Sequence, residues 1–559
     1  MKKQLPIGYS NFKDIIEGGY YYVDKSLFIK DVIDSGLVTL ITRPRRFGKT
    51  LNLSMLRYFY DLRGDNDHLF KELAIWKENN KYTSKLGQFP VIHLTFKDVK
   101  NRTWADAYEA LSGLLRHLVV QDFAYLHKWE GLNPLEKEQL HAIWQGQATR
   151  IQYSSILKTL STILDRYHSK KVVILIDEYD TPVRASYLNG YYEDMIEFVR
   201  DLMSGGMKDN DHLEKAVITG ILRVAKESIF SGLNNLDVYP ITGRQMTKHF
   251  GFSEAEVKQL IRAMELDSTY MEAIHDWYNG YTFGEDLLYN PWSIIMYSNQ
   301  SEDGFQPYWV NTSDNTLLKQ LLLTGDANIK TELNRLINGQ KLRKKIKQSL
   351  VFSELDYSKQ AVWSLLLFSG YLKAENMRQE QENRSYELSI PNREVMFVYK
   401  QFISQWIEQQ VGDEAIPQML SALIAGQIKP FQHFLKQFVI RVFSYMDTQG
   451  SEPESFYHAF ILGLLVNLES RYHIRSNRES GFGRYDILLI PKSPHDKGIV
   501  IELKSPFLED KQSLEDALAE AIVQLKTKKY SLELSSQGIS DILQLAIAVQ
   551  GKEVMIQEV

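Results

Sequence analysis

The chain has 559 residues, of which 44% are hydrophobic and 24% are charged, and its formal net charge is −5. A chain of this length is too long for one hydrophobic core, so about two to four domains are expected. The composition excludes a largely disordered or fibrous protein. The near-neutral charge gives no global attraction to nucleic acid or to acidic membranes, so any such binding must use local patches.

The sequence contains no cysteine. This excludes a disulfide framework, thiolate zinc ligands and a cysteine nucleophile. The N-terminal residues 1–8 carry positive charge without a following apolar run, which argues against a signal peptide. The longest apolar stretch, residues 456–468, is too short to span a bilayer. These features predict a soluble, cytoplasmic protein without a membrane partner.

The first predicted strand, residues 37–41, leads into the stretch Arg43-Pro44-Arg45-Arg46-Phe47-Gly48-Lys49-Thr50 and then into a helical pattern. A strand, a loop and a helix in this order predict a phosphate-binding loop for ATP or GTP, because backbone N–H groups at a helix N-terminus bind anions. Lys49 would reach the outer phosphates and the Thr50 hydroxyl would hold a magnesium ion. Arg43 stands where the usual motif has its first glycine.

We expect the nucleotide to contact a continuous run of loop residues: Arg46, Phe47, Gly48, Lys49, Thr50 and Leu51. Arg45 and Arg46 are candidates for contacts with phosphates or with a second subunit, and a homo-oligomer is among the assemblies that the sequence allows. The alternative for each arginine is an ordinary solvated loop cation.

Residues 89–96 predict a buried strand, and a second apolar run, residues 172–176, ends in Asp177 and Glu178. A central parallel strand with its carboxyl end at a ligand site has this pattern. Asp177 would hold the magnesium ion and Glu178 would polarise the attacking water. The alternative is a buried strand capped by solvated acids, but the phosphate loop upstream favours the nucleotide site.

Residues 215–220 predict a further strand that ends near Thr219 and is followed by Arg223. Thr219 is placed to sense the γ-phosphate, and Arg223 could complete the site or pair with Glu178. For each residue alone, a helix-capping threonine and a surface arginine explain the pattern equally well.

Beyond residue 245 the alternation of strands and helices fades. A serine N-cap begins a helix at residue 253, and the aromatic segment 277–293 fits the packing of a small lid domain better than base stacking. Residues 312–425 read as mostly helical, with a short strand at 386–391. The basic run 341–347 could meet phosphates, although a solvated helix face also explains it.

Two strands are predicted at residues 481–490 and 498–505, joined by a turn-rich linker and followed by a helix over 517–529. An antiparallel pair would bring Asp486 close to Glu502, with Lys504 on the same face as Glu502. Two carboxylates with a backbone carbonyl suit Mg²⁺, and a neighbouring lysine can activate water, as in metal-dependent nucleases. The alternative is a strand with ordinary exposed charges, but Glu502 follows an apolar run, where unpaired charge is costly.

Together the motifs at Arg43–Thr50, Leu175–Asp180, Gly483–Asp486 and Glu502–Lys504 resemble a bacterial family that joins an AAA-ATPase-like domain to a nuclease of the PD-(D/E)XK superfamily. The resemblance implies a restriction-endonuclease-like fold that cleaves DNA or RNA with a divalent metal. It implies a catalytic set of Asp486, Glu502 and Lys504 with Gln524 in support, and Glu454 as the candidate for a further acid. Within this family the arginine at position 43 is typical.

The sequence thus predicts an α/β protein with a P-loop NTPase parallel sheet at residues 1–250, a helical lid and linker region at 251–429 and a nuclease-like domain at 430–559. The expected function is ATP hydrolysis that controls a Mg²⁺-dependent nuclease, with nucleic acid as partner. A role in defence or mobile-element biology follows only by analogy. The alternatives are a nucleotide-switched binding regulator with a silent nuclease fold and a structural adaptor with a vestigial nucleotide site.

Overall fold

A computed structural model of the chain divides into two compact units, residues 1–314 with 343–394 and residues 315–342 with 395–559. Each unit is described by itself. The described residues are 3–223, 229–230, 235–309, 327–337, 339–349, 352–356, 358–380, 383–399, 401, 415–445, 457, 461–462, 464–468, 470–476, 479–480, 483–484, 486–493, 495–506, 512–528, 534–535 and 538–559. The predicted α/β class is confirmed, with a parallel sheet first and a mixed sheet last.

The first unit is built on a five-stranded parallel sheet in the order β2-β3-β4-β1-β5. Its strands are β1 (Val38–Thr42), β2 (Val91–Thr95), β3 (Val172–Asp177), β4 (Leu213–Gly220) and β5 (Leu236–Tyr239). Every residue of β1 and β3 is buried, as expected for central strands covered on both faces. The carboxyl ends of β1, β3 and β4 lie next to one another because the strands run in parallel.

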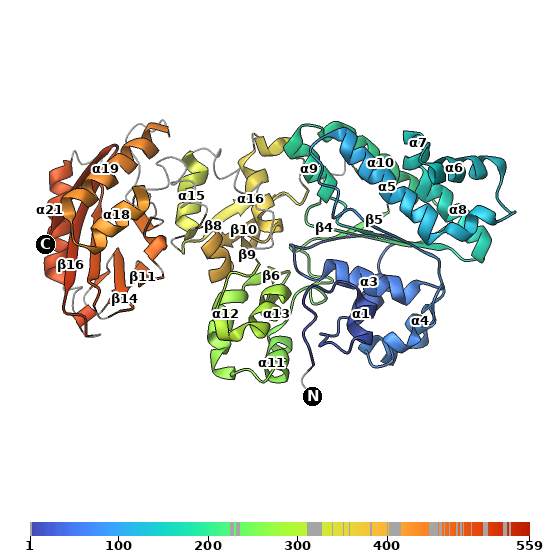
Figure 1. Cartoon of the computed structure of the whole chain (residues 1–559), viewed down its shortest axis with the longest axis horizontal. Helices are drawn as coiled ribbons and strands as arrows, with labels where there is room; N and C mark the ends of the chain where they lie inside the picture. Colours follow the sequence, from blue (N-terminus) through green and yellow to red (C-terminus); the bar gives the residue numbers. More distant parts are fainter. Residues whose placement is uncertain are drawn as a thin grey trace. The chain divides into compact units, whose positions relative to one another are not determined.

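Helices cover both faces of this sheet (Figure 1), with α5, α8 and α10 on one face and α1 and α3 on the other. The helices of this part are α1 (Phe12–Glu17), α2 (Leu27–Asp34), α3 (Lys49–Tyr60), α4 (Asn80–Thr83), α5 (Trp104–His117), α6 (Pro134–Gln145), α7 (Arg150–Ser154), α8 (Ile156–His168), α9 (Thr181–Asn189) and α10 (Tyr192–Met207). The helix that follows the phosphate loop, α3, packs against β3 and β4. It therefore starts at the edge where the carboxyl ends of the strands meet.

The remaining elements of the first unit, for which we keep the name lid, include an aromatic cluster with Tyr278, Tyr289 and Tyr297. Its elements are α11 (Glu254–Ala263), α12 (Met271–Tyr278), α13 (Pro291–Asn299), α16 (Lys359–Phe368), β6 (Tyr281–Phe283), β7 (Asp286–Leu288), β9 (Lys373–Glu380) and β10 (Asn383–Ser389). The Ser253 side chain caps α11 in a capping box with Glu256, as the sequence predicts. The aromatic segment serves packing, in agreement with the favoured prediction.

The basic run at residues 341–347 forms a strand, β8 (Leu342–Lys345), in a three-stranded sheet of order β8-β10-β9, so the alternative of a solvated helix face is wrong. Leu342 and Ile346 are buried, and the Lys344 ammonium lies 5.1 Å from the centre of the Trp363 ring. Alternate residues therefore face the interior, which is the period of a strand. The Arg343 guanidinium pairs with the Glu387 carboxylate at 2.5 Å on the same sheet.

The second unit contains a five-stranded mixed sheet of order β11-β14-β15-β16-β17. Its elements are α15 (Ala327–Ile337), α18 (Ala415–Ile424), α19 (Ile428–Tyr445), α21 (Leu514–Lys528), β11 (Tyr472–Ser476), β12 (Glu479–Ser480), β13 (Gly483–Arg484), β14 (Ile487–Pro491), β15 (Gly498–Lys504), β16 (Ile542–Gln550) and β17 (Glu553–Glu558). Strands β14 and β15 are antiparallel, as predicted. On β14, β15 and β16, buried odd-numbered residues such as Ile501 pack with α18 and α19, while buried even-numbered residues such as Val500 and Ala546 pack with α21.

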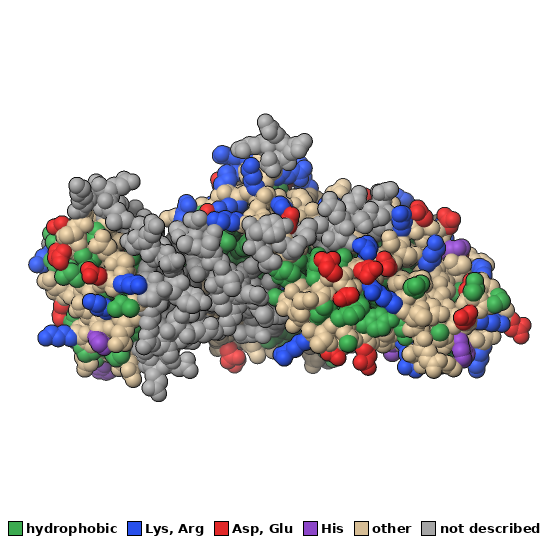
Figure 2. Space-filling view, turned by 90° about the horizontal axis from the view of Figure 1, so that it is seen from above, with side chains coloured by type: hydrophobic (Ala, Val, Ile, Leu, Met, Phe, Trp, Pro, Cys, Tyr) green, Lys and Arg blue, Asp and Glu red, His purple; other side chains and the backbone are tan. Residues whose placement is uncertain are grey.

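Among the described residues, no helix combines the length and the apolar character needed to cross a membrane. Figure 2 shows acidic, basic and hydrophobic side chains interspersed over the visible face of the first unit, in keeping with the small net charge.

A buried carboxyl group, that of Glu394, lies inside the first unit and is completely shielded from solvent. It accepts hydrogen bonds from the Ser293 hydroxyl at 2.8 Å and from the Trp309 backbone N–H at 2.6 Å. Burial nevertheless raises the pKa of Glu394 to about 8. The folded protein therefore keeps this carboxyl group protonated at neutral pH.

The pKa of Glu394 predicts a pH-dependent loss of stability. Between the unperturbed pKa of 4.5 and about 8, the unfolded chain releases a proton that the folded chain keeps. The contribution of Glu394 to the free energy of unfolding should then fall by about 1.4 kcal/mol per pH unit across this window. Urea unfolding of wild type and Glu394→Gln from pH 5 to 8 should show that the wild-type advantage shrinks as the pH rises. Parallel pH profiles for the two proteins would contradict this expectation.

Candidate functional site

The phosphate loop connects the end of β1 at Thr42 to the start of α3 at Lys49. Gly48 and Arg46 adopt left-handed backbone angles, with φ of 81° and 67°. Gly48 accepts this conformation without strain, whereas Arg46 needs the surrounding contacts to hold it. The Lys49 ammonium donates to the carbonyl oxygens of Arg43 at 3.0 Å and Pro44 at 2.9 Å. The Lys49 side chain at the end of the loop thus contacts the backbone at its beginning.

Asp177 joins the loop to the neighbouring strand ends. Its carboxylate accepts hydrogen bonds from the Thr50 hydroxyl at 2.6 Å and from the Thr219 hydroxyl at 2.5 Å. The side chain is completely buried, and burial raises its pKa although the two hydroxyl groups oppose the rise. Sequence reasoning named all three residues, and the structure brings them together because the strands are parallel neighbours.

Glu178 follows Asp177 with a left-handed φ of 51°. Its carboxylate accepts a hydrogen bond from the Thr181 hydroxyl at 3.1 Å. Burial disfavours its charge, but Lys49 and then Arg184 outweigh burial and hold its pKa below the ordinary value. Glu178 therefore stays ionised beside the phosphate loop.

Arg223 lies on the segment after β4 and is half-buried, and among the described contacts it makes no ion pair with Glu178. Two residues that the sequence reading did not assign hold this segment. The Asp180 carboxylate accepts from the backbone N–H groups of Ile221 and Leu222 at 3.2 Å. The Tyr179 hydroxyl donates to the Leu222 carbonyl at 2.7 Å. Both residues continue the acidic end of β3, and their sequence signals were this position and their place in the Leu175–Asp180 motif.

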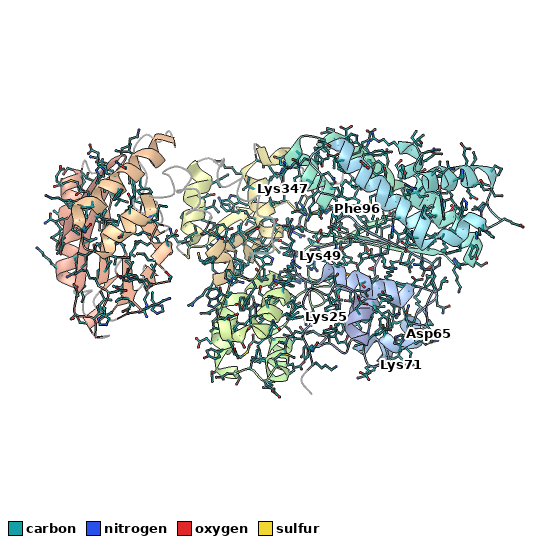
Figure 3. The ribbon with its side chains drawn as sticks, viewed as in Figure 1. Lys25, Lys49, Asp65, Lys71, Phe96 and Lys347 are labelled. Carbon is teal, nitrogen blue, oxygen red and sulfur yellow. The ribbon has the colours of Figure 1, made fainter. Side chains whose placement is uncertain are left out.

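A cavity of about 540 Å³ opens beside the loop and is bounded by the first unit alone. The charged and polar residues of its lining include Arg45, Arg46, Lys49, Thr50, Lys97, Lys100 and Glu178. The apolar and aromatic residues of its lining include Leu5, Tyr21, Val23, Phe252, Leu260 and Ile295, which belong to one hydrophobic cluster. Figure 3 labels Lys49 at the start of α3 and Lys25, another lining residue, on the lid side.

Arg43 replaces the expected glycine, and its side chain is completely buried. The guanidinium donates to the carbonyl oxygens of Thr42 at 2.8 Å, Tyr239 at 2.7 Å and Met246 at 3.1 Å. Burial lowers its pKa to about 9, which leaves the group charged at neutral pH. Arg43 therefore ties the loop to the end of β5 and to the segment that leads into the lid.

The loop residues after Arg43 also contact the lid. A Cβ atom on Gly370 would lie 2.9 Å from the Pro44 side chain, so the backbone approaches the loop closely there. The Arg46 guanidinium lies 4.4 Å from the centre of the Trp292 ring. The Phe47 ring packs on the Tyr281 ring with centroids 4.9 Å apart. Residues of the lid therefore pack against the phosphate loop.

A second cluster lies in the second unit, where β14 begins and β15 ends. The Asp486 carboxylate accepts a hydrogen bond from the backbone N–H of Leu503 at 2.8 Å. Glu502 is completely buried, and its carboxylate lies 3.7 Å from the Lys504 ammonium. Even-numbered residues of β15 face α21, the helix that carries Gln524. The described part of this cluster is thus a buried carboxylate, a lysine and an aspartate on neighbouring strands.

The donor set of this cluster suits a hard divalent cation, because the Asp486 and Glu502 carboxylates and the backbone carbonyl of Leu503 are oxygen ligands. Within the described ranges, however, no group of three or more histidine or acidic side chains gathers around one point. Glu454, the candidate for a further acid, and Tyr485 of the predicted motif lie outside the described residues. A metal held by the described residues would therefore use two carboxylates and water or backbone oxygen.

Two protein families match separate parts of the chain. Residues 6–230 match the family described as a predicted AAA-ATPase, and residues 452–559 match the PD-(D/E)XK nuclease superfamily. The phosphate loop and the Asp177 cluster lie within the first match, and the Asp486–Lys504 cluster lies within the second.

Two individual proteins are similar over longer stretches. An uncharacterized protein in the vnfD 5' region of Azotobacter chroococcum mcd 1 is 28% identical over 400 residues, which is 70% of this chain and 68% of the relative. The crystal structure of a signal transduction ATPase with numerous domains from Pyrococcus horikoshii, which has a tetratricopeptide repeat sensor, is 13% identical with a TM-score of 0.23. That match covers 80% of this chain and 54% of the other, so the chain spans about half the length of that protein. The chain thus joins a region that matches the predicted AAA-ATPase family to a region that matches the PD-(D/E)XK nuclease superfamily.

Proposed function

We propose that the first unit binds and hydrolyses ATP with Mg²⁺, and that its nucleotide state controls a Mg²⁺-dependent nuclease domain that acts on DNA or RNA. The observation that carries the proposal is the meeting of Lys49, Thr50, Asp177 and Thr219 at the carboxyl edge of the parallel sheet. The proposed division is an ATPase domain at 1–250, a lid and linker at 251–429 and a nuclease domain at 430–559. A role in defence or in mobile-element biology would suit this combination.

The cavity supports a nucleoside triphosphate because its lining offers both charged and apolar groups, which match the two ends of such a ligand. Phosphates would lie beside the loop, where backbone N–H groups at the start of α3 and the Lys49 ammonium offer positive charge. The base would lie against the apolar cluster. A bound Mg²⁺ would neutralise phosphate charge, with the Thr50 hydroxyl and the Asp177 carboxylate as its protein neighbours. Glu178, held in its ionised form, would orient the attacking water.

The second cluster supports metal-dependent cleavage because Glu502 is a buried carboxylate beside a lysine. A buried acid is costly without a cation, and Mg²⁺ together with Lys504 would supply positive charge there. Lys504 would position water or offset charge on the phosphodiester, Asp486 would complete the oxygen ligands, and Gln524 on α21 would support them.

A second candidate function is a nucleotide-switched regulator that holds nucleic acid or protein without cutting it. One observation favours it: the Lys504 ammonium already lies 3.7 Å from Glu502, so the protein supplies its own cation to this carboxylate. In that case, binding to nucleic acid would not need Mg²⁺ and would be unaffected by Asp486→Ala.

The proposed ATP site predicts that Lys49→Ala lowers ATP turnover by about 100-fold or more, because the outer phosphates lose their principal cation. Phosphate release and ATP titration by calorimetry would measure the effect. Lys85→Ala is a matched control, because Lys85 pairs with Glu214 and does not line the cavity. Equal turnover in wild type and Lys49→Ala would exclude this site.

The nuclease site predicts that Glu502→Gln and Lys504→Ala each lower Mg²⁺-dependent cleavage of DNA or RNA by about 100-fold or more, because the first removes a carboxylate ligand of Mg²⁺ and the second removes the cation that acts on the reacting phosphate. Gel assays with labelled single-stranded DNA, duplex DNA and RNA at saturating ATP would measure cleavage. Lys497→Ala is the control, because Lys497 lies before the other end of β15 and pairs with Asp541. If wild type cleaves none of these substrates, the nuclease half of the proposal fails.

A further inference from the structure

The phosphate loop has a support that its own sequence does not reveal. The Trp309 indole N–H donates to the carbonyl oxygen of Arg45 at 3.3 Å, while the backbone N–H of Trp309 donates to the Glu394 carboxyl group at 2.6 Å. Trp309 is fully buried, and its ring packs on the Tyr371 ring with centroids 5.1 Å apart. It therefore links Glu394 to the loop.

Glu394 also fixes the next loop residue. Its two carboxyl oxygens lie 3.0 Å and 2.8 Å from the Ser293 hydroxyl at the start of α13. Ser293 directly follows Trp292, whose ring lies 4.4 Å from the Arg46 guanidinium. One buried carboxyl group thus holds two tryptophans that contact successive residues of the phosphate loop.

The position of these two loop residues matters for any bound phosphate. Arg45 and Arg46 line the cavity next to Lys49, and Arg46 has a left-handed φ of 67°. A residue without glycine's freedom keeps such a conformation only where its surroundings enforce it. The contacts through Trp292 and Trp309 enforce it from the lid side.

We propose that Glu394 is a positioning residue for nucleotide binding. It fixes Arg45 of the phosphate loop through Trp309, and it fixes Arg46 through Ser293 and Trp292. This inference rests on the ATP site proposed above. Glu394 lies outside the cavity lining, so it acts on ATP only through the loop. Because it shapes the site before chemistry begins, its loss changes ATP affinity and leaves the rate at saturating ATP largely unchanged.

Trp309→Phe in the full chain is the sharpest test, because it removes the indole N–H and keeps an aromatic ring. ATP affinity measured by calorimetry should fall about 3-fold to 10-fold, the size of one hydrogen bond. The matched control is Trp363→Phe, since Trp363 is equally buried and its indole N–H has no hydrogen-bond partner within the described residues. This control should bind ATP within about 2-fold of wild type.

Glu394 itself is tested with a conservative and a disruptive variant. At pH 7 Glu394→Gln keeps an acceptor for the Trp309 N–H and should bind ATP nearly as wild type does, whereas Glu394→Leu should weaken binding by about 10-fold with little change in kcat. Circular dichroism would establish that each variant is folded. If folded Trp309→Phe binds ATP as tightly as Trp363→Phe, the positioning role is wrong. If neither the Trp363→Phe control nor the wild-type protein binds ATP, the proposed ATP site itself is wrong.

Discussion

Arg43 stands where phosphate loops usually carry glycine. Its buried guanidinium connects the loop, the edge of the sheet and the lid of the first unit. Arg43 is charged and inaccessible to water, so it needs polar partners inside the protein. It finds them in carbonyl groups at the ends of β1 and β5 and at Met246, where the chain turns toward the lid. The rings of Phe250 and Phe283 lie 5.1 Å and 5.3 Å from the guanidinium carbon. Loop, sheet edge and lid are therefore fixed at one point.

The rest of the candidate site follows from this attachment. Because the lid packs against the loop, the cavity is lined by both charged and apolar residues within one compact unit. The Lys49 ammonium now contacts the Arg43 and Pro44 carbonyls, and an entering phosphate would compete with them for it. Through Trp292, Trp309 and Glu394, the same loop reaches the end of the first unit, where the chain passes from residue 394 to residue 395. The phosphate loop and the lid are therefore joined by continuous contacts.

Much of this architecture was predictable from local patterns. Apolar runs identified β3 and β15, and the meeting of Thr50, Asp177 and Thr219 followed from the geometry of parallel strands. The alternation along β15 correctly placed Glu502 and Lys504 on one face. Sequence patterns could not find the partners of Glu394, which lie 85 and 101 residues away, because no local signal encodes such contacts. The basic run at 341–347 was wrongly interpreted as a helix face. Its buried positions, Leu342 and Ile346, are too few to indicate a strand among so many charged residues.

The central claim is that nucleotide state controls a metal-dependent nuclease domain. Its most direct test is the rate of Mg²⁺-dependent cleavage of labelled DNA or RNA by the full chain without nucleotide, with ATP, with a non-hydrolysable ATP analogue and with ADP. The account predicts that the rate differs between the ATP-bound and ADP-bound states, and that Lys49→Ala abolishes this difference while Lys85→Ala preserves it. The same cleavage rate in all nucleotide states, with ATP demonstrably bound, would contradict it.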